Sequence, residues 1–125
     1  MTENEISYVI RSAIIKTYIV LGPGLLESAY QAVLRYELVK AGLHVRAEVA
    51  VPVVHEDVKL DVGYRIDLLI EEKVIIEIKS VETLSPVHHK QALTYLKLSG
   101  RKLAILVNFN CEDIQKSIFR KVNGL

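Results

Sequence analysis

Cysteine is almost missing from this chain, because Cys111 is the only one among 125 residues. A single cysteine cannot form an intrachain disulfide, and it cannot supply the paired ligands of a zinc finger. A secreted disulfide scaffold and a zinc finger are therefore excluded. A lone thiol suits a reducing interior, so we expect a cytoplasmic protein.

Long apolar runs and internal repeats are missing as well. No stretch approaches the roughly 20 apolar residues that a membrane helix needs. The start, Thr2-Glu3-Asn4-Glu5, lacks the basic-then-apolar layout of a signal peptide. Half of the residues are hydrophobic and a quarter are charged, as in ordinary soluble domains. We expect one globular domain over residues 1–125 and no membrane partner.

An excess of one charge is also missing. Sixteen Lys and Arg residues against fifteen Asp and Glu residues leave a net charge of +1, so no bulk basic field attracts nucleic acid. Any such binding must use a local patch, since phosphate contacts need only local cations. The candidate contacts are Lys90, Lys97, Arg101 and Lys102. The alternative for these four is a solvated surface.

Several familiar catalytic signatures do not occur. There is no Gly-rich phosphate loop and no Ser-His-Asp signature, and Cys111 has no activating histidine nearby in sequence. P-loop nucleotide hydrolysis and thiol catalysis are disfavoured. Adjacent His88 and His89 point in different directions on a helix and lack the i, i+4 spacing of zinc helices. They are better interpreted as surface groups or phosphate contacts.

Hydrophobic periodicity predicts an α/β sandwich in which helices flank a central mixed β-sheet. Thr2 and Glu5 form a capping box for the first helix, and Gly22-Pro23-Gly24 ends it. Helices are expected over about residues 2–20, 25–41 and 87–99, and strands over 45–55, 59–70, 74–79 and 102–109. The last strand follows a helix and should pair in parallel. Residues 112–122 fit either a short helix or a strand.

A candidate hairpin lies in the middle of the chain. Two apolar runs of strand length, residues 64–70 and 74–79, flank three charged residues. A strand that is buried on both faces should be nearly all apolar, yet these runs contain Asp67, Glu77 and Lys79. Those three side chains need a reason to be there.

The register of the hairpin decides which of these charges meet. A three-residue turn pairs Ile70 with Val74 and sets Asp67 against Glu77, with Lys79 on the same face. Like charges that face each other repel unless a cation lies between them. Carboxylate oxygens suit Mg²⁺ or Mn²⁺, and a neighbouring lysine could orient a water or steady developing negative charge.

A second register remains open at this point. A two-residue turn slips the pairing by one residue and sends Asp67 to the opposite face. Asp67 and Glu77 would then be ordinary strand charges, paired with Arg65 or Lys79.

Two helices offer further polar candidates. Glu27 shares a stripe with apolar residues of the second helix, although it also lies in the first turn, where it could stay solvated and favour the helix dipole. Gln91 and Tyr95 lie one turn apart on the third helix and could line the same cleft as Glu77. Alternatively, Tyr95 belongs to the core and Gln91 is solvated.

These residues together carry a family resemblance. Residues 24–30 read Gly-Leu-Leu-Glu-Ser-Ala-Tyr and match G-x-x-E-x-x-Y; Asp67, then 77–79 (Glu-Ile-Lys), then Gln91-x-x-x-Tyr95 follow in order. The chain resembles the GxxExxY family, a small prokaryotic branch of the PD-(D/E)xK nuclease superfamily, over about residues 6–109. One departure is Ile66, which stands where proline precedes the aspartate in the motif.

The resemblance implies a restriction-endonuclease-like fold and roles for the candidate residues. Asp67 and Glu77 resemble the metal-binding carboxylates, and the carbonyl of Ile78 and the Glu27 carboxylate would complete the set. Lys79 resembles the catalytic lysine that positions the attacking water. Gln91 and Tyr95 resemble the Q-x-x-x-Y of the exonuclease and junction-resolvase branches and would orient a phosphate or the lysine.

Two functions from different classes follow. The first is a Mg²⁺-dependent or Mn²⁺-dependent phosphodiesterase that acts on nucleic acid, DNA ahead of RNA. A chain this small would work as a homodimer or within a larger complex. The second is a catalytically silent module of the same fold that binds nucleic acid or a protein partner. The intact carboxylate set favours catalysis, because a pure binder has no need for it.

Overall fold

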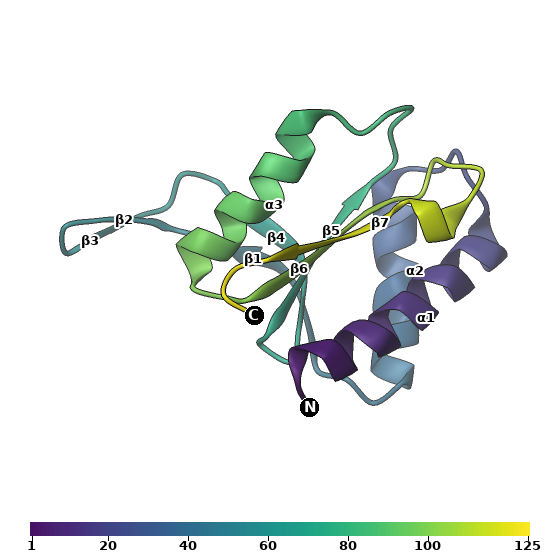
Figure 1. Ribbon diagram of the computed structural model, residues 1–125, viewed down its shortest axis with the longest axis horizontal. Helices are drawn as coiled ribbons and strands as arrows, with labels where there is room; N and C mark the ends of the chain where they lie inside the picture. The colour runs from purple at the N-terminus through teal and green to yellow at the C-terminus, as the bar shows by residue number, and fades with distance from the viewer.

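A five-stranded mixed sheet forms the centre of the molecule, and the computed structural model describes all 125 residues (Figure 1). In spatial order its strands are β1 (Val45–Ala50), β4 (Arg65–Ile70), β5 (Val74–Lys79), β6 (Leu103–Asn108) and β7 (Ile118–Val122). β5 and β6 run parallel, and the other neighbours are antiparallel. The predicted mixed sheet is confirmed, and so is the parallel pairing predicted for the strand after the third helix, which is β6.

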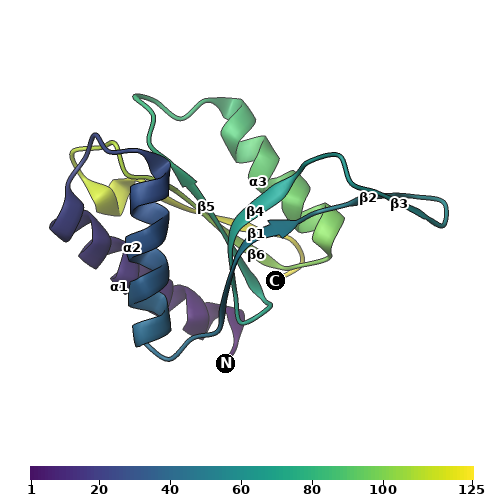
Figure 2. The same ribbon diagram turned by 180° about the vertical axis from the view of Figure 1, so that it is seen from behind.

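Helices cover both faces of this sheet, as Figures 1 and 2 show. α1 (Glu3–Leu21) and α2 (Glu27–Lys40) pack on one face, and α3 (Pro86–Ser99) packs on the other. The core under α1 and α2 has 19 buried residues, whereas the core under α3 has only eight. The thinner core under α3 leaves room for polar side chains on that face, at the ends of β4 and β5.

The helix ends follow local sequence signals. The predicted capping box of α1 is present: the Thr2 hydroxyl accepts a hydrogen bond from the Glu5 N–H (3.2 Å), and the Glu5 carboxylate accepts one from the Thr2 N–H (2.9 Å). At α3, the Nδ1 atom of His88 accepts from the Ser85 N–H (3.1 Å). His89 packs edge-on against the Phe119 ring. Both histidines therefore have structural contacts.

Two of the predicted strands are each divided in two. The stretch 45–55 breaks after Ala50 near Pro52, which lacks the N–H that a continuing ladder needs. The stretch 59–70 breaks around Gly63, whose φ is +88°. The outer pieces, β2 (Val53–His55) and β3 (Val58–Leu60), pair with each other as a ribbon that extends away from the sheet (Figure 1).

The C-terminal segment, for which the sequence left helix and strand open, contains both. A single 3₁₀ turn, η1 (Ile114–Lys116), leads into β7, which pairs antiparallel with β6 at the edge of the sheet. None of the helices has the length and apolar content that would let it cross a membrane.

Candidate active site

The β4–β5 hairpin has the three-residue turn. Ile70 pairs with Val74, and Leu69 pairs with Ile75. The turn closes through a hydrogen bond from the Lys73 N–H to the Ile70 carbonyl (2.9 Å), and both glutamates between them have φ near +54°. The one-residue slip is therefore excluded.

At the end of the hairpin away from the turn, hydrogen bonds from the backbone to two carboxylates take the place of backbone–backbone hydrogen bonds. One oxygen of Glu77 (Oε1) accepts from the Asp67 N–H at 3.2 Å, and one oxygen of Asp67 (Oδ2) accepts from the Ile78 N–H at 2.7 Å. Each side chain thus binds the backbone of the opposite strand, so the two carboxylates lie next to each other. Their other oxygens accept no hydrogen bond from the protein, and neither is sealed from solvent.

Burial makes this pair reluctant to ionise. Glu77 is only 4 % exposed, and burial, together with the charge of Asp67, raises the pKa of Glu77 to about 8. Burial also raises the pKa of Asp67 to about 6, although the Ile78 N–H and the charge of Lys79 oppose that rise. The free oxygens therefore attract either a proton or a cation near neutral pH.

No cationic side chain pairs with either carboxylate. Arg65 instead bonds to Asp61, with an Nη1 to Oδ1 distance of 3.0 Å. Lys79 forms no ion pair within 4.0 Å, but its charge lowers the pKa of both carboxyl groups. The interpretation of Asp67 and Glu77 as ordinary ion-paired strand charges is therefore wrong, and the Lys79 ammonium remains available to a third group.

Glu27 lies at the start of α2 with its side chain exposed, while Tyr30 and Leu34 on the same stripe are buried. The carboxylate is therefore not sealed in the core as the stripe suggested. Its Oε2 accepts from the Ser80 N–H (3.1 Å), directly after Lys79. Its charge helps to raise the pKa of Asp67. Glu27 thus reaches the same end of β5 as the hairpin pair.

Glu48 is a fourth carboxylate that the sequence did not identify. In β1 it occupies the register position opposite Asp67, between residues that pair normally. Gln31 of α2 donates to the Glu48 carboxylate (2.9 Å) and to the Asp67 carbonyl (3.4 Å). The charge of Glu48 raises the pKa of Asp67 and of Glu77. The available signals were an acid within a short apolar strand and a glutamine one helical turn after Glu27.

The backbone of Glu48 is strained, because its φ is +54° in the middle of a strand. We expect Glu48→Gly to be more stable than Glu48→Ala by about 1 kcal/mol, since both lose the carboxylate but only glycine relieves the strain. Urea unfolding of the two variants measures this difference. The same pair at Arg46, two residues earlier, should show the opposite order. An alanine variant at position 48 as stable as the glycine variant would contradict the expectation.

Gln91 and Tyr95 lie on α3, and Tyr95 packs with Ile75 on the sheet face that also carries Glu77. The Gln91 amide donates to the Tyr95 hydroxyl at 3.0 Å. Burial raises the pKa of Tyr95, and the negative charge of Glu77 adds to that rise. A pocket of about 420 Å³ opens beside this pair. It is lined by Tyr64, Val87, Lys90, Gln91, Thr94 and Tyr95.

The four candidate phosphate contacts do not lie together. Lys90 lines the pocket beside Gln91, but Lys97 lies in the last turn of α3. Arg101 and Lys102 precede β6, which runs parallel to β5, so they lie near the hairpin turn. There Arg101 donates from Nε to the Glu72 carbonyl (3.1 Å). Of the four, only Lys90 lines the pocket beside Gln91 and Tyr95.

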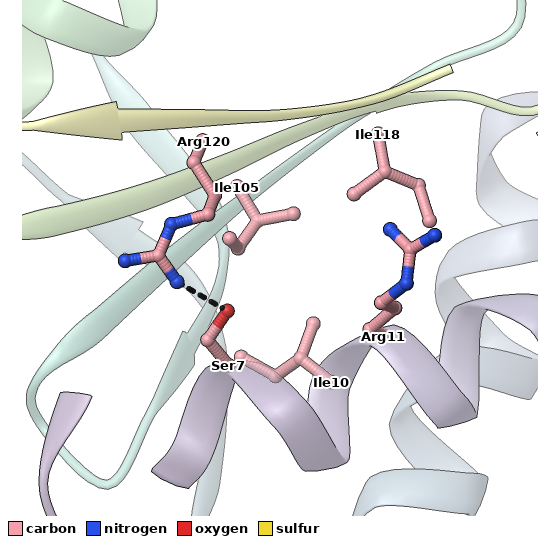
Figure 3. A pocket seen from close by; sticks show the side chains of 6 residues that line it. All are labelled: Ser7, Ile10, Arg11, Ile105, Ile118 and Arg120. Carbon is pink, nitrogen blue, oxygen red and sulfur yellow. Dashed lines mark hydrogen bonds between the residues drawn. The ribbon is translucent and has the colours of Figure 1, made fainter. Parts of the chain in front are cut away.

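A second hollow, of about 180 Å³, lies on the opposite face of the sheet between α1 and the β6–β7 pair (Figure 3). It is lined by Ser7, Ile10, Arg11, Ile105, Ile118 and Arg120. Arg120 is held there by a hydrogen bond to the Ser7 hydroxyl (3.0 Å). None of the candidate site residues reaches this hollow.

The chemistry of the donor set fits a divalent cation. No three acidic, histidine or cysteine side chains converge on one point in this structure. Even so, Asp67 and Glu77 each keep one carboxylate oxygen without a hydrogen bond or ion pair to the protein, and carboxylate oxygen is the ligand that Mg²⁺ and Mn²⁺ prefer. Glu27 and Glu48 add negative charge at the same place.

A comparison with protein families identifies the superfamily of this chain. The sequence pattern of the PD-(D/E)XK nuclease superfamily matches residues 4–121, nearly the whole chain. Comparisons with curated proteins and with solved structures gave no match. The mixed sheet between helices is consistent with the restriction-endonuclease-like fold of that superfamily. The chain therefore belongs to the PD-(D/E)XK nuclease superfamily.

Proposed function

We propose that this protein is a Mg²⁺-dependent or Mn²⁺-dependent nuclease that hydrolyses phosphodiester bonds in nucleic acid, DNA ahead of RNA. Membership of the GxxExxY branch is part of this proposal. The observation that carries it is the pair of buried Glu77 and half-buried Asp67, which forms no ion pair with a protein cation, with the unpaired ammonium of Lys79 on the same face.

Each residue then has a role. The free oxygens of Asp67 and Glu77 would hold the cation, with Glu27 and the Ile78 carbonyl as further ligands. The bound cation supplies charge neutralisation and Lewis-acid stabilisation of the phosphate. Lys79 donates hydrogen bonds to the attacking water and orients it toward phosphorus.

Two residues of α3 would fix the substrate. The Tyr95 hydroxyl, held by Gln91, can donate a hydrogen bond to a phosphate oxygen while it accepts one from the Gln91 amide. Lys90 would contact a neighbouring phosphate from the rim of the pocket.

The cost of the carboxylate pair favours catalysis over a silent binding module. Two adjacent carboxyl groups with raised pKa values, one buried and one half-buried, destabilise the folded chain at neutral pH. A binding module gains nothing from this arrangement, whereas a metal-dependent hydrolase requires it.

Calorimetric titration with Mn²⁺ and Mg²⁺ at pH 8 tests the proposal. We expect the wild type to bind and Glu77→Ala to lose binding at least tenfold, because removing a charged ligand of a metal typically costs that much or more. Glu71→Ala is the matched control, since it removes the same charge at the turn end of the same hairpin. A screen of labelled single-stranded and duplex DNA and RNA follows.

Two results would reject the proposed metal-dependent nuclease. The first is an absence of metal binding even with nucleic acid present. The second is metal-independent cleavage that Glu77→Ala leaves unchanged. Nucleic-acid binding without metal binding or cleavage would favour the silent module.

A further inference from the structure

We propose that the pocket beside Gln91 and Tyr95 binds one unpaired nucleobase, so that the substrate class is single-stranded nucleic acid or a frayed strand end. This inference rests on the proposed nuclease function and adds the substrate class. The pocket has a volume of about 420 Å³, within the range of small-molecule sites, and is large enough for a single nucleoside.

Tyr64 supplies an aromatic surface at the mouth of this pocket. Its side chain is 39 % exposed, and its ring centroid lies 5.7 Å from that of Tyr95 at an interplanar angle of 55°. The buried Tyr95 thus supports one side of the Tyr64 ring. The exposed side can stack on a base, which is how proteins commonly hold unpaired nucleotides.

The loop that carries Tyr64 is already fixed. The Tyr64 carbonyl accepts from the Val51 N–H at 2.9 Å. On either side, the Asp61 carboxylate accepts from the Gly63 N–H (3.0 Å) and pairs with Arg65. Binding a base would therefore cost little ordering of this loop.

The polar groups of the pocket match the remaining parts of a nucleotide. Gln91 uses its amide N–H on Tyr95, so its carbonyl oxygen is free to accept from the edge of a base. The Lys90 ammonium forms no ion pair and can meet the adjoining phosphate. Tyr95 packs with Ile75, and strand alternation places Glu77 on the same face of β5, so a base in this position lies on the face of the sheet that carries the proposed reaction centre.

The charge distribution argues against a duplex as the preferred substrate. A duplex binder contacts many phosphates at once, but the net charge is +1, and of the four candidate cations only Lys90 adjoins the site. Stacking also needs an exposed base face, which a paired and stacked base does not offer. One aromatic ring and one lysine suffice for a single strand.

Fluorescence anisotropy in Mg²⁺ tests the inference, with every protein carrying Lys79→Met to stop cleavage. A labelled single-stranded oligonucleotide is compared with its duplex. We expect the single strand to bind more tightly than the duplex, and Tyr64→Ala to weaken single-strand binding about tenfold, as for a lost base–aromatic stack. Tyr64→Phe should bind like the parent, because it keeps the ring.

Two further variants complete the experiment. Tyr36→Ala, which removes a more exposed tyrosine from α2, far from the pocket lining, should not change the affinity. Thr94→Leu fills the pocket from an exposed helix position and should weaken single-strand binding, which provides a second test if Tyr64→Ala fails to fold.

The inference and the nuclease proposal can fail separately. Single-strand affinity that neither Tyr64→Ala nor Thr94→Leu lowers, or tighter binding of the duplex, overturns the base pocket even if the wild type cleaves. Conversely, Tyr64-dependent binding of the single strand without cleavage by the wild type supports the pocket and rejects the hydrolase.

Discussion

Replacing Lys79 with methionine is expected to lower the rate of phosphodiester cleavage about 1,000-fold while metal binding persists. Methionine keeps much of the length and apolar volume of lysine but cannot donate a hydrogen bond to the water or the phosphate. Loss of one such donor at a reacting centre typically costs about 100-fold to 1,000-fold in rate. Since Lys79 forms no ion pair, the carboxylates keep all their hydrogen bonds to the protein.

Single-turnover cleavage at saturating Mg²⁺ measures the rate, and calorimetry measures the affinity for the metal. Lys73→Met is the matched control: its ammonium, at the turn of the same hairpin, bonds to the Met1 carbonyl (2.6 Å). An unchanged rate in Lys79→Met would remove the lysine from the mechanism. Loss of metal binding in that variant would assign Lys79 to the cation site instead.

The hairpin could be predicted from the sequence because its signals are local. Three charged residues between two apolar runs fix the register once the turn length is known, and strand alternation then brings Asp67 and Glu77 together. The sequence could not show that each carboxylate bonds to the backbone of the opposite strand. The backbone ladder of the hairpin ends at the Leu68–Ile76 pair, and the carboxylate hydrogen bonds form just beyond it, at Asp67 and Glu77.

Glu48 was missed for the opposite reason, because its place depends on distant partners. β1 pairs with β4 across the intervening β2–β3 ribbon, and the Glu48 side chain is held by a glutamine of α2. Its left-handed backbone also gives no sequence signal, since glutamate rarely adopts that conformation.

Two of the candidate phosphate contacts are close to Tyr95 in the sequence but lie away from Glu77 in the fold. Arg101 and Lys102 are near Tyr95 along the chain, but α3 returns the chain to the start of a parallel strand. The start of β6 pairs with the start of β5, so these cations lie at the turn end of the hairpin, away from Glu77. The parallel pairing was itself predicted, and combined with the hairpin register it would have indicated this separation.

Glu77→Gln is expected to stabilise the metal-free protein, by an amount that grows with pH. The pKa of Glu77 is near 4.5 in the unfolded chain and about 8 in the folded one. Below pH 4.5 both states hold the proton and there is no penalty. As the pH rises from 4.5 to 8 the unfolded state releases its proton first, so the stability of the wild type falls; above pH 8 the penalty is constant.

Glutamine removes this penalty and keeps a carbonyl oxygen for the Asp67 N–H. Each pKa unit corresponds to about 1.4 kcal/mol, so we expect a gain of about 2 kcal/mol or more at pH 9, and little gain at pH 4. Thermal unfolding in EDTA measures it, as a rise in Tm of about 5 °C or more at the higher pH. Glu71→Gln, at the turn, should leave the pH profile unchanged.

Addition of Mg²⁺ makes this prediction specific to the proposed site. A cation that binds Asp67 and Glu77 replaces the proton, so saturating Mg²⁺ should raise the Tm of the wild type most at pH 9. It should leave Glu77→Gln nearly unchanged, because that variant has lost a ligand. A wild type whose stability does not fall between pH 5 and 9 would show that ionisation of the pair does not destabilise the folded state. A shift of equal size in both proteins would place the cation elsewhere.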